Sequence, residues 1–220
     1  MNLRLSHEHD DSTQEIKLLS EYTALATTYD RRWSAYLDAS LTMTTGFLAE
    51  LPATRILDVD CGTGLLLKIL SDRPDSPQLA GIDRVPAMLD EARKRLGSDA
   101  TLLDADAENL PFEDASFDLV TCTSALHYFL DSDAMFRELR RVTAPSGNVI
   151  ITDWSRDFFW MKVLNKILPL TRHAHSHTFT SRELEQGLDK VGFRVVRSAS
   201  KKIDWFWGLM TVHASPRNES

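Results

Sequence analysis

The sequence has few of the features that mark secreted, membrane-spanning or nucleic-acid-binding proteins. Only two cysteines occur in 220 residues, so a disulfide framework is excluded and a reducing cytoplasm is the expected location. No run of about 18 apolar residues occurs, which excludes an obvious membrane-spanning helix. The N-terminus is polar and acidic, unlike a signal peptide. A net charge of −7 argues against DNA or RNA as a large ligand.

The sequence has a glycine-containing loop, but this loop lacks the full pattern of either a dinucleotide-binding fingerprint or a P-loop. Residues 55–64 read R-I-L-D-V-D-C-G-T-G, which predicts a buried strand, a glycine turn and a following helix. The dinucleotide fingerprint needs a third glycine where Leu67 stands, and no Gly-Lys-Ser/Thr ending occurs. Asp58 ends the strand, and a carboxylate there favours a cationic ligand over a pyrophosphate. S-adenosylmethionine (SAM) carries both an ammonium and a sulfonium.

This stretch resembles motif I of the class I SAM-dependent methyltransferases, which usually reads Asp/Glu-x-Gly-x-Gly-x-Gly. Asp58, Gly62 and Gly64 match that pattern, whereas Asp60 stands where the family has its first glycine. The substitution adds a side chain and a negative charge near the amino-acid end of SAM. We expect SAM to bind with Asp60 either turned aside or helping to hold the ammonium group.

Further along the chain, acids recur where the same resemblance expects contacts with the nucleoside. Asp83 follows the second predicted strand, about twenty residues beyond the glycines, at the place of a ribose-hydroxyl acceptor. The run D-A-D-A-E-N-L-P-F is similar to another family motif, which implies that Asp106 and the Ala107 N–H bind the adenine edge. The alternative for Asp106 is a turn-capping role.

Together these patterns give a set of expected cofactor contacts. Tyr29 lies in a segment that resembles the family's tyrosine-containing lid, and Met88 lies in the helix after Asp83. Ordinary core packing is the alternative for both side chains. The full set comprises Tyr29, Asp58, Asp60, Gly62, Gly64, Asp83, Arg84, Met88, Asp106, Ala107 and Thr123.

The candidate catalytic residue is His127, in the segment T-S-A-L-H-Y-F-L. The family often has a similar Leu-His segment beside the sulfonium, and a neutral imidazole can accept a proton near neutral pH. The alternative is that His127 only forms a wall of the site. The Asn/Asp-Pro-Pro-Tyr-like motif of DNA amino-methyltransferases is absent.

Residues 154–179 are the part least similar to the family. Their many apolar side chains predict a helix over the ligand crevice, and Trp154, Phe158, His173 and His177 are the expected substrate contacts. His173, His175 and His177 alternate, so on a strand they would share one face, as metal ligands can. No acid accompanies them, and we expect a polar substrate-facing loop and no metal.

Strands alternating with helices, followed by two terminal strands, predict a doubly wound α/β domain. The resemblance further implies a mostly parallel, seven-stranded sheet with an antiparallel C-terminal hairpin. We expect five parts: a helical lid (residues 1–53), a SAM-binding core (54–153), a substrate cover (154–180), a C-terminal helix and hairpin (181–214) and a tail (215–220).

The resemblance implies an enzyme that transfers a methyl group from SAM to a small molecule, mainly by positioning the reactants. The apolar cover favours a partly hydrophobic acceptor, although the sequence does not reveal whether oxygen, nitrogen, sulfur or carbon is methylated. Two alternatives are a SAM-binding protein without transferase activity and a carboxymethyl or decarboxylative variant. We expect no nucleic-acid partner and no stable membrane anchor, and the sequence leaves the oligomeric state open.

Overall fold

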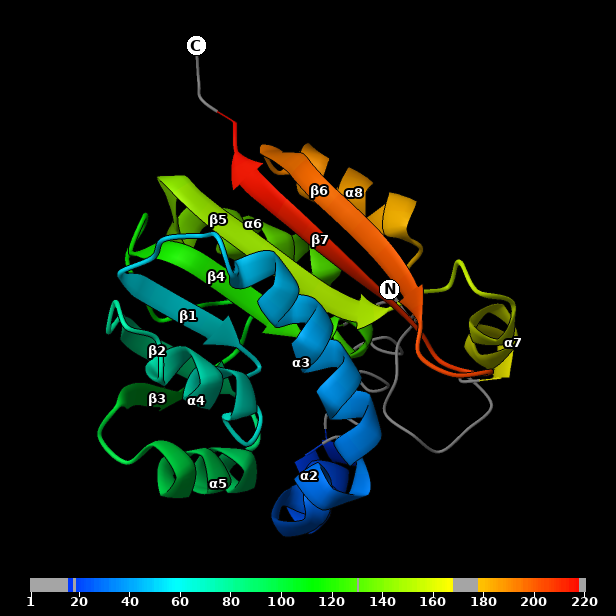
Figure 1. Cartoon of the computed structure of the whole chain (residues 1–220), viewed down its shortest axis with the longest axis horizontal. Helices are drawn as coiled ribbons and strands as arrows, with labels where there is room; N and C mark the ends of the chain where they lie inside the picture. The colour runs from blue at the N-terminus through cyan, green and yellow to red at the C-terminus, as the bar shows by residue number, and fades with distance from the viewer. Residues whose placement is uncertain (1–15, 18, 130, 168–177, 218–220) are drawn as a thin grey trace, which may run out of the picture.

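A single mixed sheet forms the centre of the computed structural model, which describes residues 16–17, 19–129, 131–167 and 178–217 (Figure 1). Its seven strands lie in the order β3-β2-β1-β4-β5-β7-β6. The first five pair in parallel and the last two are antiparallel, which confirms the predicted fold class. The strands are β1 (Arg55–Val59), β2 (Gln78–Asp83), β3 (Ala100–Asp104), β4 (Phe117–Thr123), β5 (Thr143–Trp154), β6 (Phe193–Lys202) and β7 (Gly208–Pro216).

Helices cover both faces of the sheet, because the central strands are apolar on both sides. On β1, Ile56 packs against one helical layer and Leu57 against the other, and both are fully buried. The first layer contains α3 (Ser34–Leu48), α4 (Leu65–Ser71) and α5 (Pro86–Leu96). The second contains α6 (Ser132–Val142) and α8 (Ser181–Lys190). A capping box begins α8, as Thr180 followed three residues later by Glu183 predicts, and the two residues exchange hydrogen bonds.

The N-terminal segment runs across the front of the sheet in Figure 1. Residues 19–25 are helical, and η1 (Ala26–Thr28) and α2 (Tyr29–Arg32) lead into α3. A chain of buried hydroxyls joins α3 to the sheet: Thr44 donates to Thr152 over 2.8 Å, and Thr152 lies 2.8 Å from Thr211. Since α3 is bonded to β5 in this way, its C-terminal half is part of the core packing and not only a cover.

The structure corrects the expected boundaries of the last strands. The sequence predicts a turn at residues 144–147, yet these residues lie within β5, where the pairing jumps from Phe117–Thr143 to Leu119–Asn148. The turn-forming residues are therefore accommodated as an irregularity in a longer strand. The sequence also predicts a final strand over residues 205–214. This start is too early, because Trp205–Trp207 belong to the hairpin turn and β7 begins at Gly208.

Helix α7 (Phe159–Ile167) lies beside that hairpin turn, at the end of the sheet (Figure 1). This arrangement depends on the close approach of the Phe158 ring to Gly208. A Cβ atom on Gly208 would lie only 1.9 Å from Cδ2 of Phe158, so glycine lets the ring rest directly on the strand backbone. Phe158, Leu164 and Trp207 then pack against Trp154 and the buried Met161 in a small separate core. No described helix is long and apolar enough to cross a bilayer.

Candidate functional site

A pocket lies at the carboxyl ends of the parallel strands, where an open α/β sheet binds its ligands. The loop after β1, the ends of β2 and β4, and the N-terminal segment enclose it. Its volume is about 1180 Å³ when the solvent at its open mouth is included. Eight of the expected cofactor residues line it: Tyr29, Asp58, Asp60, Gly62, Asp83, Arg84, Met88 and Thr123.

Two buried carboxylates project from the ends of β1 and β2. Asp58 accepts a hydrogen bond from the Thr121 hydroxyl over 2.7 Å, and burial raises its pKa to about 7. Asp83 accepts backbone N–H bonds from Gly62 and Val85, each at 2.8 Å. Burial raises the pKa of Asp83 to about 6, although those two bonds oppose the shift. Both groups thus sit where a bound cation would favour their ionised form.

Asp60 adopts a left-handed backbone conformation with φ 55°, which explains why related sequences carry glycine here. Aspartate is one of the few other residues that adopt this region readily. Burial and then repulsion from Asp83 raise the pKa of Asp60 well above its usual range, while Arg84 opposes the shift. Its Oδ1 atom is shielded from solvent and has no hydrogen-bond partner within the described residues.

The two glycines of the loop after β1 have different structural roles. Gly62 (φ 54°) lines the pocket, and its N–H is held by Asp83. Gly64 (φ 77°) is the residue before α4 and does not line the pocket. A Cβ there would lie 3.1 Å from Cβ of Ala92 on α5, so this glycine permits close packing of the two helices. Packing therefore accounts for glycine at this position, and a contact of Gly64 with the cofactor stays a prediction.

The N-terminal segment closes the pocket through polar contacts that the sequence did not predict. Asp30 accepts a hydrogen bond from the Thr63 hydroxyl of the glycine loop over 2.7 Å and also pairs with Arg95 of α5. Tyr36 donates to Ser124 over 2.8 Å. A third contact joins the hydroxyls of Tyr22 and Tyr128 across the pocket.

All four tyrosines of the chain are thus at this site, since Tyr22, Tyr29 and Tyr128 line the pocket and Tyr36 bonds one of its lining residues. The tyrosine-containing segment E-Y-T-A-L-A-T-T-Y-D was the available sequence signal for Tyr22. Tyr128 follows His127 in a segment similar to a Leu-His-Tyr segment of the family, and that was its sequence signal. Burial keeps these hydroxyls neutral at physiological pH; it raises the pKa of Tyr22 to about 12.

Two expected adenine contacts lie outside the residues that line the pocket. Asp106 accepts a hydrogen bond from the N–H of Glu108 over 2.9 Å, as a turn-capping residue does, and lies 3.9 Å from Arg84. Ala107 is fully buried. The turn-capping alternative therefore describes the observed bond of Asp106, and binding of the adenine edge stays a prediction for both residues.

His127 and Asp153 form a buried pair behind the pocket wall. Nδ1 of His127 lies 2.7 Å from Oδ1 of Asp153, and both side chains are almost fully buried. Asp153 also accepts the N–H groups of Leu126 and Trp154, and the Trp154 ring stacks on the imidazole with centroids 3.9 Å apart. Ala125 and Tyr128 line the pocket, whereas His127 does not. Asp153 was missed as a site residue, although its place after the fifth strand was a usable signal.

The expected substrate contacts are only partly within the described structure. Trp154 is buried at the end of β5, and Phe158 packs in the small core beside the hairpin. Neither lines the pocket, so their contact with substrate stays a prediction. His173 and His177 lie outside the described residues. Within the ranges that the structure describes, no group of three or more potential ligands is placed to hold a metal.

Comparisons with known proteins agree with this geometry. The family described as "Methyltransferase domain" matches residues 57–151. A demethylmenaquinone methyltransferase of Thermus thermophilus is 38% identical over 103 residues, which cover 46% of this chain and 47% of that protein. The ubiquinone/menaquinone biosynthesis C-methyltransferase UbiE of Citrifermentans bemidjiense is 28% identical over 213 residues, covering 86% of each chain. The resemblance to the class I SAM-dependent methyltransferases that the motifs indicate is thus confirmed by similarity to a methyltransferase domain over residues 57–151. The match spans about half the length of the Thermus relative.

A solved structure described as a DhpI–SAH complex shares the fold of this chain, with a TM-score of 0.70 at 21% identity over 92% of this chain and 97% of that one. The lining of the pocket suits a ligand such as SAM. Besides Oδ1 of Asp60, the hydroxyl of Thr123 is a buried pocket atom without a hydrogen-bond partner in the described ranges. Buried polar atoms usually have partners, so these two fit a pocket whose ligand completes their bonding.

Proposed function

We propose that this protein transfers the methyl group of SAM to a small, partly apolar molecule. The observation that carries the proposal is the set of three acids, Asp58, Asp60 and Asp83, that converge on one pocket below a tyrosine-rich lid. A dinucleotide or triphosphate would meet repulsion from these carboxylates, whereas SAM brings an ammonium, a sulfonium and two ribose hydroxyls. We assign Asp58 and Asp60 to the ammonium side and Asp83 to the ribose.

In this reaction a nucleophilic atom of the acceptor attacks the methyl carbon opposite the sulfur. The new bond forms as the carbon–sulfur bond breaks, and the electron pair of that bond returns to sulfur, which becomes a neutral thioether. The chain's contribution is to hold donor and acceptor in line and to exclude water, which can supply several kcal/mol of the barrier. A base is needed only if the acceptor atom carries a proton.

His127 is our candidate for that base. Its carboxylate partner, Asp153, would hold Nδ1 as the N–H donor, which directs the basic character of a neutral ring to Nε2. Because Ala125 and Tyr128 line the pocket whereas His127 does not, a role in shaping the wall competes with the base role.

The acceptor class is supported by the relatives and by the apolar character of the chain near the site. Two relatives carry menaquinone in their names. Leu37, Leu41 and Phe129 add apolar side chains to the lining of the pocket. We therefore propose a quinone-like or other ring-bearing acceptor with an apolar tail.

In the decisive experiment the protein is incubated with methyl-labelled SAM and a panel of hydroquinone and naphthol acceptors. The labelled product is measured together with S-adenosylhomocysteine (SAH), which is SAM without its methyl group. We expect stoichiometric formation of both. Asp83→Ala should weaken SAM binding in titration calorimetry, whereas Asp104→Ala, at the tip of the neighbouring strand and outside the pocket lining, serves as the matched control. SAM binding without turnover on any acceptor would favour a binding protein lacking transferase activity.

A further inference from the structure

An apolar surface lies at the end of the molecule where α7 meets the hairpin turn. We call Phe159, Trp160, Ile167 and Trp205 the aromatic patch. Their exposed fractions are 69%, 41%, 47% and 69%. Only seven large apolar side chains in the described part of the chain are exposed to this degree, and four of them gather here. Exposed aromatic side chains in one place commonly mark an interaction surface.

Ring contacts join the two segments of the patch. The centroids of Phe159 and Trp160 lie 5.4 Å apart, and Trp160 meets Trp205 across the gap between α7 and the hairpin at 5.7 Å and 82°. The N–H of Ser155 also donates to Gly208 over 2.8 Å, which fixes the approach to α7 against the hairpin. The patch is therefore one surface built from two distant parts of the sequence.

The exposed arc of α7 combines this apolar surface with positive charge. At about 100° per residue, the arc passes through Lys162, Lys166, Phe159, Val163, Ile167 and Trp160 in that order. Met161 lies on the opposite side and is fully buried. The helix thus presents aromatic and aliphatic groups with two lysines along one border, a composition typical of helices that lie in a membrane interface.

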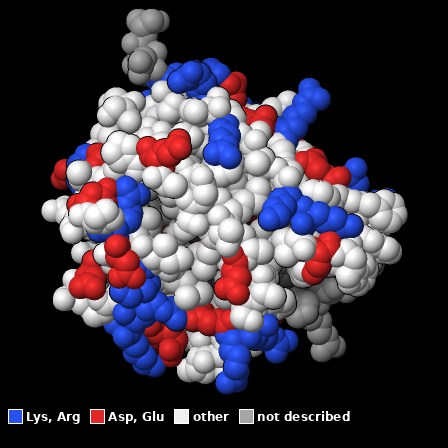
Figure 2. Space-filling model, in the orientation of Figure 1, with Lys and Arg blue, Asp and Glu red and all other residues white. Residues whose placement is uncertain are grey.

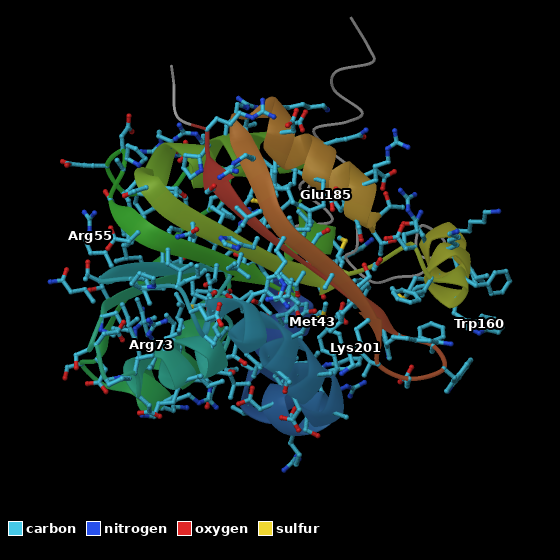
Figure 3. The ribbon with its side chains drawn as sticks, turned by 45° about the horizontal axis from the view of Figure 1, so that its top comes forward. Met43, Arg55, Arg73, Trp160, Glu185 and Lys201 are labelled. Carbon is cyan, nitrogen blue, oxygen red and sulfur yellow. The ribbon has the colours of Figure 1, made fainter. Side chains whose placement is uncertain are left out.

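The hairpin adds two more exposed lysines, Lys201 and Lys202, next to the patch. Figure 3 shows Trp160 at the edge of the molecule and Lys201 on the strand that leads to the turn. In Figure 2 the surface on that side carries basic and acidic atoms next to uncharged ones. Two acids lie in these segments: Asp157 accepts from Ser181, and Asp204 accepts the N–H groups of the turn. Because these partners are uncharged, both carboxylates keep their charge, and the four lysines outnumber them by two. This corner is basic on a chain whose net charge is −7.

We propose that the aromatic patch and its four lysines dock the protein reversibly on an anionic lipid bilayer. Tryptophan suits the boundary between acyl chains and headgroups because its ring is apolar and its N–H can stay hydrated. Lysines at the border of the patch are attracted to a bilayer with a net negative charge, which a surface of zwitterionic lipids does not offer. The occupant that matches both features together is a bilayer surface with negative headgroups.

The patch is continuous with the wall of the SAM site. From Trp205, aromatic contacts run through Phe206 and Trp207 to Trp154, which stacks on His127. Docking would therefore bring the acceptor side of the pocket close to the bilayer, where an acceptor with an apolar tail resides. This last step rests on the proposed function, whereas docking itself does not.

The test is binding of the full chain to vesicles of phosphatidylcholine alone or mixed with phosphatidylglycerol, measured by co-sedimentation. We expect binding to the mixed vesicles that weakens as salt is added, together with a blue shift of tryptophan emission. Phe159→Ser with Trp205→Ser should reduce the partition coefficient about tenfold or more. Lys162→Gln with Lys166→Gln should reduce it about 25-fold, at about fivefold for each lysine.

The matched controls are Ile69→Ser on α4 and Lys190→Gln on α8, which carry an exposed apolar and an exposed basic side chain elsewhere. Circular dichroism checks that each variant is folded. Equal partition of the patch variants and wild type, or no binding to anionic vesicles, would overturn the proposal. So would self-association without lipid that the patch variants abolish, because the patch would then join copies of the chain. Methyl transfer to a water-soluble acceptor should be unchanged in the patch variants, which separates failure of docking from failure of the proposed function.

Discussion

Asp58→Asn should make the ligand-free protein more stable at alkaline pH while it removes SAM binding. The substitution keeps the size of the side chain and an oxygen that can accept the Thr121 hydroxyl bond. It removes a carboxylate that is 3% exposed and whose pKa burial raises from 3.8 to about 7. Since one pKa unit corresponds to about 1.4 kcal/mol, the ionised folded state bears a cost of about 4 kcal/mol.

The sign of the pH dependence follows from the raised pKa. Below about pH 4 the carboxyl is protonated in both folded and unfolded chains, so it adds no penalty. As the pH rises to about 7, the unfolded chain releases the proton while the folded chain retains it, and stability is lost. The free energy of unfolding of Asp58→Asn relative to wild type should therefore rise by about 3 kcal/mol between about pH 4.5 and 8.5.

The assay is urea unfolding of both proteins without ligand across that pH range. The new amide N–H₂ group adds an offset of about 1–3 kcal/mol if it lacks an acceptor, but this offset does not depend on pH. The diagnostic quantity is therefore the change with pH in the difference between the unfolding free energies of the two proteins. A difference that stays constant with pH would refute the assignment of Asp58 as a buried acid with a raised pKa. Calorimetry with SAM then shows whether the stabilised variant has lost the cofactor.

Three further predictions concern the same pocket. SAM affinity should rise with pH between about 5.5 and 7.5, because the cation favours ionised Asp58 and Asp83, whose pKa values in the free protein are about 7 and about 6; a flat calorimetric profile would contradict this. Asp60→Gly should raise stability by about 1 kcal/mol by relieving a left-handed backbone and should weaken SAM binding, whereas unchanged affinity would remove Asp60 from the site. His127→Gln should lower stability by about 3 kcal/mol because Asp153 loses a buried partner, and a rate loss of about 100-fold with an altered pH profile would identify a base.

The sequence was sufficient to predict the fold and the acidic side of the pocket, for a clear physical reason. Parallel strands place their carboxyl ends at one edge, so acids that follow consecutive apolar runs, such as Asp58 and Asp83, come together without any knowledge of distant contacts. The motif also predicts that Gly64 contacts the cofactor, but it gives no sign of the packing role that the structure shows for this glycine. Its packing against Ala92 depends on the distance between two helices, which a one-dimensional pattern does not contain.

Contacts between segments distant in sequence were also beyond the reach of pattern analysis. The Tyr22–Tyr128 contact joins residues far apart in the chain, and the pairing of His127 with Asp153 requires β5 to lie beside β4. Likewise, the extension of β5 through residues 144–147 contradicts local turn propensity, because pairing on both sides of the irregularity holds the strand in place. Tertiary pairing outweighs the local preference there.

The contact of Phe158 with the bare backbone of Gly208 has a consequence for how this protein can diversify. A single added methyl group at Gly208 would push the ring away and tilt α7 with it. Changes that alter α7 must therefore be matched by changes in the hairpin turn, although the two are separate in the chain. Swapping only one of them between related enzymes should yield a poorly packed hybrid, whereas exchanging both together should transfer an intact surface.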